Sequence, residues 1–296
     1  MIKGLDPNII DRERDAVESL VSTEWLEAEL GAPDLRVIDA TMFLPGTGRD
    51  ARAEYEAAHI PGAVFLDIEE VSDGDSPFPH MLPSEHKFAS RMQSLGLGDG
   101  SRFVVYDNSP LHSGARIWWM LKAFGAHYAA ILDGGLQKWN AEGRPLERGR
   151  PQVRHGHFTA FLDDKAAVDK AFVSGLVGAG SHEIVDARSA DRFAGTAAEP
   201  RPGIASGHIP GARSLPQSDL FQADNRWKRD AELRAAFDAA GIDLSRPMVT
   251  TCGSGVTAAV LLFGAHLLGK EDVQIYDGSW SEWGADPDTP KAVGAA

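Results

Sequence analysis

Short apolar runs alternate with amphipathic segments along most of this chain. Phe88, Met92 and Leu95 recur at helical spacing just before Gly96, and Leu233, Phe237 and Ala240 do the same later in the chain. The apolar runs, rich in β-branched and aromatic residues, are Phe103–Tyr106, Ile131–Leu132, Met248–Thr251 and Val273–Tyr276. Strands that alternate with helices predict an α/β fold, with parallel sheets covered by helices on both faces.

Three landmarks occur twice, in the same order. They are Val37–Ala40 with Ile184–Ala187, Ala58–Ala63 with Gly207–Ala212, and Asp133–Trp139 with Asp277–Trp283. A repeat with so long a period indicates duplicated domains rather than a solenoid. His59 and His208 belong to the second landmark in both copies, which favours a structural role for them at a turn.

The duplication divides the chain into two α/β domains and a linker. We expect an N-terminal domain at 18–141, a linker at 142–165 and a C-terminal domain at 166–288. The linker is rich in Arg, Gly, Pro and His and lacks periodicity. Residues 1–17 and the tail after Ala285 are expected to be peripheral arms.

A strand, a small-residue loop and an apolar helix surround the single cysteine of the chain. Met248–Thr251 leads into Cys252, and Val256–Leu268 follows as the predicted helix. Gly253 and Gly255 allow successive N–H groups to converge, and a helix start adds its positive dipole end. This setting favours a thiolate, so we interpret Cys252 as a nucleophile rather than as a small buried hydrophobe.

The corresponding loop of the first copy has no nucleophile. When the two strands are superimposed, Asp107 stands where Cys252 stands, and the loop 107–114 is longer and contains Pro110. Proline removes one N–H donor from that loop. The N-terminal domain is therefore expected to lack the catalytic thiol, and the C-terminal domain to be the catalytic one.

Composition and net charge limit the classes of molecule that we expect this protein to bind. The 296 residues carry a net charge of −14, which disfavours nucleic acid or an anionic membrane surface as the main partner. One cysteine excludes an internal disulfide or a two-cysteine relay. No apolar run has the length of a signal peptide or a membrane span, so we expect a cytoplasmic protein. His155 and His157 lack neighbouring ligands, and neither a metal nor a cofactor is expected.

These residues together resemble the tandem-domain rhodanese superfamily. The resemblance covers about residues 20–285 and rests on the repeated His-Ile-Pro-Gly-Ala, on the Asp-Gly turns before Trp139 and Trp283, and on the loop 252–258. It implies two rhodanese-like domains, each a parallel sheet with helices on both faces. It also implies an enzyme that moves sulfur through a persulfide on Cys252 to a thiol, a thioredoxin-like protein or cyanide.

The resemblance also implies a donor and a set of site residues. Thiosulfate-preferring members carry basic residues directly after the cysteine, whereas this chain has Gly253 and Ser254, so we expect 3-mercaptopyruvate as donor and pyruvate as product. The implied substrate-binding residues are Arg192, Arg201, Gly253, Gly255, Val256 and Thr257. The implied catalytic residues are Cys252 and a proton relay formed by Ser254, His80 and Glu69. We expect Arg188 to be structural and Arg116 to line the cleft between the domains.

Three alternatives differ in testable ways. A thiosulfate sulfurtransferase would differ only in its donor. A sulfur carrier or interaction module would take up one sulfur without turnover. A cysteine phosphatase needs an arginine six residues after the cysteine, a position that Ala258 occupies here, which argues against that class.

Overall fold

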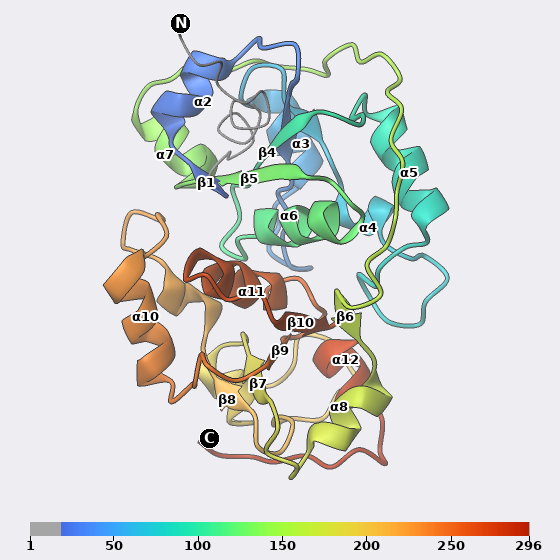
Figure 1. The fold of residues 1–296 in the computed structure, drawn as a ribbon, viewed down its shortest axis with the longest axis vertical. Coiled ribbons are helices and arrows are strands. Elements are labelled where there is room, and N and C mark those ends of the chain that lie inside the picture. The colour runs from blue at the N-terminus through green and yellow to red at the C-terminus, as the bar shows by residue number, and fades with distance from the viewer. Residues whose placement is uncertain (1–18, 296) are drawn as a thin grey trace, which may run out of the picture.

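Two five-stranded parallel sheets with the same strand order form the frame of the molecule (Figure 1). The structure, a computed structural model, describes residues 19–295, so the expected arm at 1–17 lies outside the described residues. The first sheet has the order β1 (Leu20–Val21), β5 (Tyr128–Leu132), β4 (Arg102–Tyr106), β2 (Leu35–Asp39), β3 (Val64–Phe65). The second has the order β6 (Ala167–Val168), β10 (Val273–Tyr276), β9 (Met248–Thr251), β7 (Glu183–Asp186), β8 (Arg213–Ser214). The predicted duplication of an α/β unit is therefore confirmed.

Helices cover both faces of each sheet. Successive residues of a strand point to opposite faces, so neighbouring strand residues pack against different helices. In the first half the helices are α2 (Thr23–Glu29), α3 (Ala51–Ala57), α4 (Ile68–Val71), α5 (Glu85–Ser94), α6 (Gly114–Ala123) and α7 (Gly135–Ala141). In the second half they are α8 (Lys170–Leu176), α9 (Ala190–Phe193), the 3-10 turn η1 (Gln217–Leu220), α10 (Asp230–Ala239), α11 (Ala258–Leu267) and α12 (Ser279–Trp283). Val105 of β4 packs with α5 and α6, whereas its neighbour Val104 packs with α2, α3 and α7.

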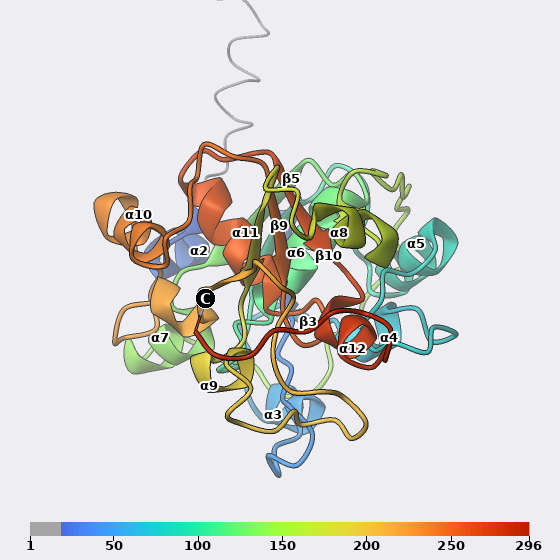
Figure 2. The same ribbon diagram turned by 90° about the horizontal axis from the view of Figure 1, so that it is seen from below.

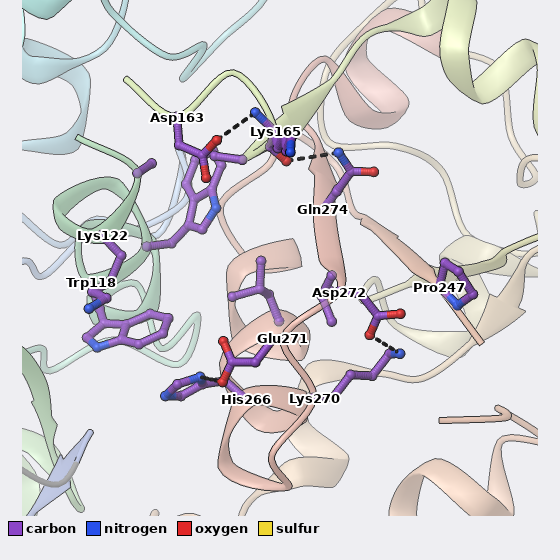
Figure 3. A pocket seen from close by; sticks show the side chains of 15 residues that line it. Trp118, Lys122, Asp163, Lys165, Pro247, His266, Lys270, Glu271, Asp272 and Gln274 are labelled. Carbon is purple, nitrogen blue, oxygen red and sulfur yellow. Dashed lines mark hydrogen bonds and ion pairs between the residues drawn. The ribbon is translucent and has the colours of Figure 1, made fainter. Parts of the chain in front are cut away.

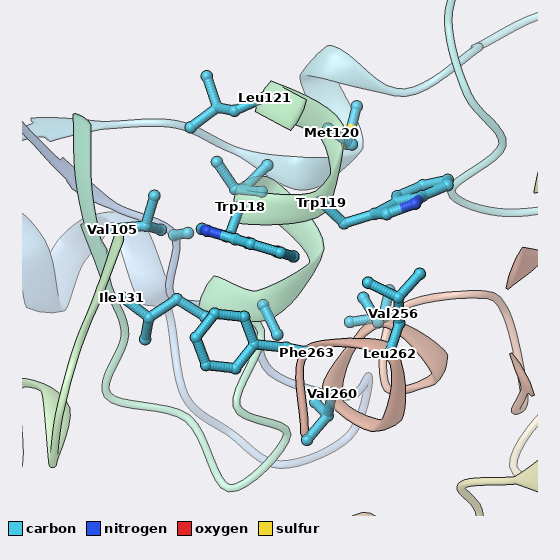
Figure 4. Packing of buried hydrophobic residues seen from close by; sticks show 14 of the residues in the cluster. Val105, Trp118, Trp119, Met120, Leu121, Ile131, Val256, Val260, Leu262 and Phe263 are labelled. Carbon is cyan, nitrogen blue, oxygen red and sulfur yellow. The ribbon is translucent and has the colours of Figure 1, made fainter. Parts of the chain in front are cut away.

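One hydrophobic core runs through both domains, and α6 and α11 meet at its centre (Figure 4). The Trp118 and Phe263 rings pack edge to face, with centroids 4.7 Å apart. Every residue from Ala258 to Ala265 is buried, as expected of a helix that is apolar on all sides. The predicted helix begins at Ala258 rather than Val256, because Val256 and Thr257 belong to the preceding loop.

The linker and the C-terminal tail follow the surface in different ways. Residues 142–165 contain no helix or named strand and run past α5, where Gly156 N–H donates to Gln93 O (Figure 1). The tail after Ala285 is not the peripheral arm that we expected. It crosses the second domain (Figure 2), and Ala292 pairs with His208 while Trp283 Nε1 donates to Pro290 O. These bonds satisfy backbone groups of the domain itself.

The two repeated histidines occupy equivalent buried positions. His59 Nδ1 lies 2.8 Å from Tyr55 O, and His208 Nδ1 lies 2.8 Å from Phe193 O. Each imidazole also stacks on the aromatic ring of the residue that it contacts. Both histidines therefore fix a turn, as the sequence predicted.

Candidate active site

Cys252 lies at the carboxyl end of β9, at the centre of the second sheet. Its side chain is buried, with 2 % exposed. The start of α12 holds the carbonyl groups of the loop: Trp280 N–H donates to Cys252 O, and Ser281 donates to Gly253 O through both N and Oγ. The carboxyl edge of a parallel sheet is where α/β proteins place their ligands.

Most backbone N–H groups of the cysteine loop have no acceptor in the part of the chain that the structure describes. Within residues 19–295, the backbone N–H groups from Gly253 to Thr257 make no hydrogen bond to another protein group. They precede the N-terminus of α11, whose dipole adds positive potential. Such a set of free donors forms a cradle for an anion, including the terminal sulfur of a persulfide.

The first domain fills the same cradle with its own side chain. Asp107 Oδ1 accepts from Ser109 N–H at 2.9 Å, and Oδ2 accepts from Gly114 N–H at 2.8 Å. Burial raises the pKa of Asp107 to about 7. The first loop therefore lacks a thiol, and its own carboxylate occupies two of its N–H donors, which gives a geometric reason for assigning chemistry to the second domain.

Three of the predicted site residues form one hydrogen-bonded chain across the domain boundary. His80 Nδ1 lies 2.8 Å from Ser254 Oγ, and His80 Nε2 lies 2.7 Å from Glu69 Oε1. His80 is buried in the loop between α4 and α5, whereas the Glu69 side chain is 64 % exposed. The chain thus connects the cysteine loop to solvent, which is the arrangement that proton transfer needs.

Both predicted substrate arginines belong to the second domain, and Arg192 lies beside the cysteine loop. A side chain at Gly253 would bring its first carbon within 3.1 Å of Arg192 Nη2, so Arg192 lies directly over the cysteine loop. Its guanidinium is held by Glu199, which also accepts from Arg188 Nη1 at 2.7 Å. Arg188 is buried and also pairs with Asp186, consistent with the structural role expected for it.

Arg201 is partly exposed and acts electrostatically on Glu69 of the relay. The hydrogen bond with His80 lowers the pKa of Glu69 against the opposing effect of partial burial, and the positive charge of Arg201 lowers it further. Among residues 19–295, the Arg201 side chain has no hydrogen-bonding partner, so its guanidinium is available to a ligand.

Sequence reasoning missed the serines that hold the loop. Ser279 Oγ accepts from Cys252 N–H at 3.2 Å, and Ser281 binds Gly253 O. Both follow the repeated Asp277-Gly278 turn, at positions where the first copy has Gly135 and Gln137. A comparison of the two copies position by position contained this signal.

We predict that Glu69→Gln lowers kcat about tenfold between roughly pH 5.5 and 8. The pKa of Glu69 lies below its usual 4.5, so the carboxylate is ionised throughout this range and the loss is independent of pH. The native protein loses this charge only when the pH falls through that lowered pKa, which lies below 4.5, and the two profiles converge there. Kinetic pH profiles measure this, with Glu70→Gln on the same helix as the matched control. Parallel profiles at all pH values would contradict an ionised Glu69 in the relay.

The hollow drawn in Figure 3 lies elsewhere. Its volume is about 480 Å³, and its lining includes Lys122, His266 and Gln274 but no residue of the cysteine loop or the relay. It adjoins Val273 and Pro247, at the amino ends of the strands. None of the described residues forms a metal-ligand cluster, and none of the described helices is long and apolar enough to cross a membrane.

Comparison with known proteins agrees with this architecture. The Rhodanese-like domain matches residues 22–142 and 170–286. Human 3-mercaptopyruvate sulfurtransferase is 44 % identical, over 90 % of this chain and 91 % of that protein. Bovine thiosulfate sulfurtransferase is 41 % identical, over 90 % and 91 %. The crystal structure of SseA from Escherichia coli, described as a 3-mercaptopyruvate sulfotransferase, superposes with a TM-score of 0.82 at 40 % identity, over 89 % of this chain and 99 % of that one. With two matched domains and relatives of this similarity over nearly its whole length, the chain belongs to the rhodanese family of tandem-domain sulfurtransferases.

Proposed function

We propose that this sulfurtransferase takes sulfur from 3-mercaptopyruvate, holds it as a persulfide on Cys252 and passes it to an external acceptor. The division of the chain into 18–141, 142–165 and 166–288 is part of the proposal: the first domain supplies the relay and the second supplies the nucleophile. No second cysteine exists to receive the sulfur, so the acceptor is a separate molecule.

The first half-reaction forms one bond and breaks one. The Cys252 thiolate attacks the thiol sulfur of the donor, a sulfur–sulfur bond forms, and the carbon–sulfur bond breaks. Its electron pair stays on the three-carbon fragment as the enolate of pyruvate. The proton of the donor thiol passes through the Ser254–His80–Glu69 relay and reaches the enolate carbon, which gives pyruvate. Arg192 and Arg201 bind the carboxylate and the enolate oxygen.

The observation that carries this choice of donor is the relay of His80 between Ser254 and Glu69. A thiol donor with a carbon leaving group must lose one proton and regain one, whereas thiosulfate brings no proton and releases sulfite. A built proton path therefore favours mercaptopyruvate over thiosulfate. The neutral Gly253 and Ser254 beside the cysteine support the same choice.

Mass spectrometry after exposure to mercaptopyruvate tests the proposal. We expect one added sulfur on Cys252 and one pyruvate released for each sulfur bound, followed by ping-pong turnover with cyanide or a small thiol. A higher kcat/KM for thiosulfate than for mercaptopyruvate would contradict the proposed donor. Uptake of one sulfur with no further pyruvate in the presence of acceptors would instead identify a carrier.

A thiol of low molecular weight or a thioredoxin-like protein is the acceptor class that fits a buried persulfide. A cytoplasmic location is part of the proposal, because a reducing compartment keeps the single Cys252 as a free thiol. Fractionation of cells that express the native protein checks this point.

A further inference from the structure

The two Asp-Gly turns clamp the domains together in equivalent ways. Asp277 Oδ2 accepts from Leu82 N–H of the first domain at 2.7 Å, and Asp133 Oδ1 accepts from Trp227 N–H of the second domain at 2.9 Å. The other oxygen of each aspartate pairs with an arginine, which is Arg116 for Asp277 and Arg229 for Asp133.

The two arginines differ in what else they bind. Arg229 is 49 % exposed, and its Nη2 lies 3.1 Å from Asp133. Arg116 is fully buried, and its guanidinium donates to Asp277, to Gly255 O at 3.3 Å and to His80 O at 2.5 Å. Only the clamp beside the cysteine loop therefore touches the candidate catalytic residues.

Arg116 contacts the backbone on both sides of the bond between His80 and Ser254. His80 has φ 61, a left-handed conformation that a residue with a side chain rarely adopts without support. Gly255, next to Ser254, has φ 78, and a carbon added there would lie 3.0 Å from Arg116 Nη1. One guanidinium thus fixes the histidine of one domain against the serine loop of the other.

Stability alone is a poor reason for this arrangement. Arg116 and Asp277 are withdrawn from water, and Arg116 Nε has no hydrogen-bonding partner among the described residues. A buried ion pair with an unsatisfied donor is often no more stable than apolar residues of the same volume. What the pair does provide is a fixed geometry.

We propose that Arg116, which lies on the domain without the nucleophile, is a positioning residue that holds His80 and the cysteine loop in register for proton transfer. The proposal rests on the relay argued under the proposed function. It predicts that Arg116 acts on the rate through His80, with no contact to the substrate.

A double-mutant cycle tests this dependence. His80→Ala is expected to lower kcat for mercaptopyruvate about a hundredfold. Arg116→Lys keeps the positive charge but removes the planar guanidinium that donates to several acceptors at once. We expect kcat to fall about tenfold with little change in KM. Combined with His80→Ala, it should cause no further loss. Arg229→Lys, the matched control in the other clamp, should leave kcat unchanged.

Thermal unfolding of each variant separates folding from positioning. If Arg116→Lys does not fold, Asp277→Asn, which loosens the guanidinium while retaining the side-chain shape, should show the same dependence on His80. A tenfold loss that persists in the His80→Ala background would overturn the inference and leave the relay intact. If His80→Ala leaves kcat unchanged, the proposed relay is wrong, and so is this inference.

Discussion

Cys252→Ser is expected to abolish both sulfur uptake and turnover. Hydroxyl oxygen is a far weaker nucleophile than thiolate at neutral pH and cannot form a persulfide. The side chains have similar volumes, so we expect the free energy of unfolding to change by less than about 1.5 kcal/mol. Pyruvate release and the mass of the intact protein after exposure to mercaptopyruvate measure the result.

Asp107→Asn in the other loop provides the matched control for this variant. It occupies the equivalent place in the first domain, where the side chain accepts two N–H groups and takes no part in the proposed reaction. Turnover should persist in Asp107→Asn. Since the chain has no second cysteine, any turnover that remained in Cys252→Ser would disprove the persulfide mechanism.

Much of the fold was predictable because the chain repeats itself. Each landmark occurs twice, so β2 and β7 could be recognised from one another even where a single short strand is ambiguous. The long apolar stretch around Leu261 correctly indicated a helix, which the structure shows to be buried from Ala258 to Ala265. Its start at Ala258 was missed because Val256 continues the apolar run and the boundaries of a helix are poorly defined by sequence pattern alone.

The part of the site that lies within one contiguous segment could be predicted from the sequence. The part that depends on contacts between the two domains could be predicted less well. Cys252 and its glycines are contiguous, so the loop was evident from the chain alone. The roles of His80 and Glu69 came from family resemblance, and the contact of His80 with Ser254 depends on how the domains dock. No local sequence pattern indicated that Arg116 would bind Asp277. The contact joins α6 of the first domain to the Asp-Gly turn of the second domain.

The C-terminal tail shows another limit of local reasoning. Its sequence is polar and lacks periodicity, which is typical of an arm, yet Ala292 pairs with His208. Backbone hydrogen bonds stabilise that pairing, and the pattern of side chains along a segment does not predict which backbone groups will pair. Asp107 is similar: the sequence excluded a nucleophile there, whereas only the structure shows the carboxylate occupying the donors of its own loop.

We expect Arg192→Gln and Arg201→Gln each to lower kcat/KM for mercaptopyruvate about ten- to hundredfold, and the double variant to lower it about a thousandfold. A hydrogen bond to a charged group contributes about 1.5–3 kcal/mol, and the two arginines belong to separate segments, Arg192 to α9 and Arg201 to the loop that follows it. Arg192→Gln should still fold, because Glu199 keeps its ion pair with Arg188. Steady-state kinetics of the folded variants measure the losses.

A ketothiol without a carboxylate, such as mercaptoacetone, distinguishes binding of the substrate carboxylate from general damage to the site. If the arginines bind that carboxylate, the native enzyme should prefer mercaptopyruvate strongly, and the double variant should lose most of that preference, because the poor donor loses fewer interactions. Arg226→Gln, which removes an exposed arginine paired with Asp224, is the matched control and should keep the native preference. Equal losses for both donors would argue against carboxylate recognition and would assign the two arginines to the structure of the loop, since Arg192 lies against Gly253. The ratio of the two kcat/KM values therefore decides whether the net charge of −14 is overcome by a local basic site.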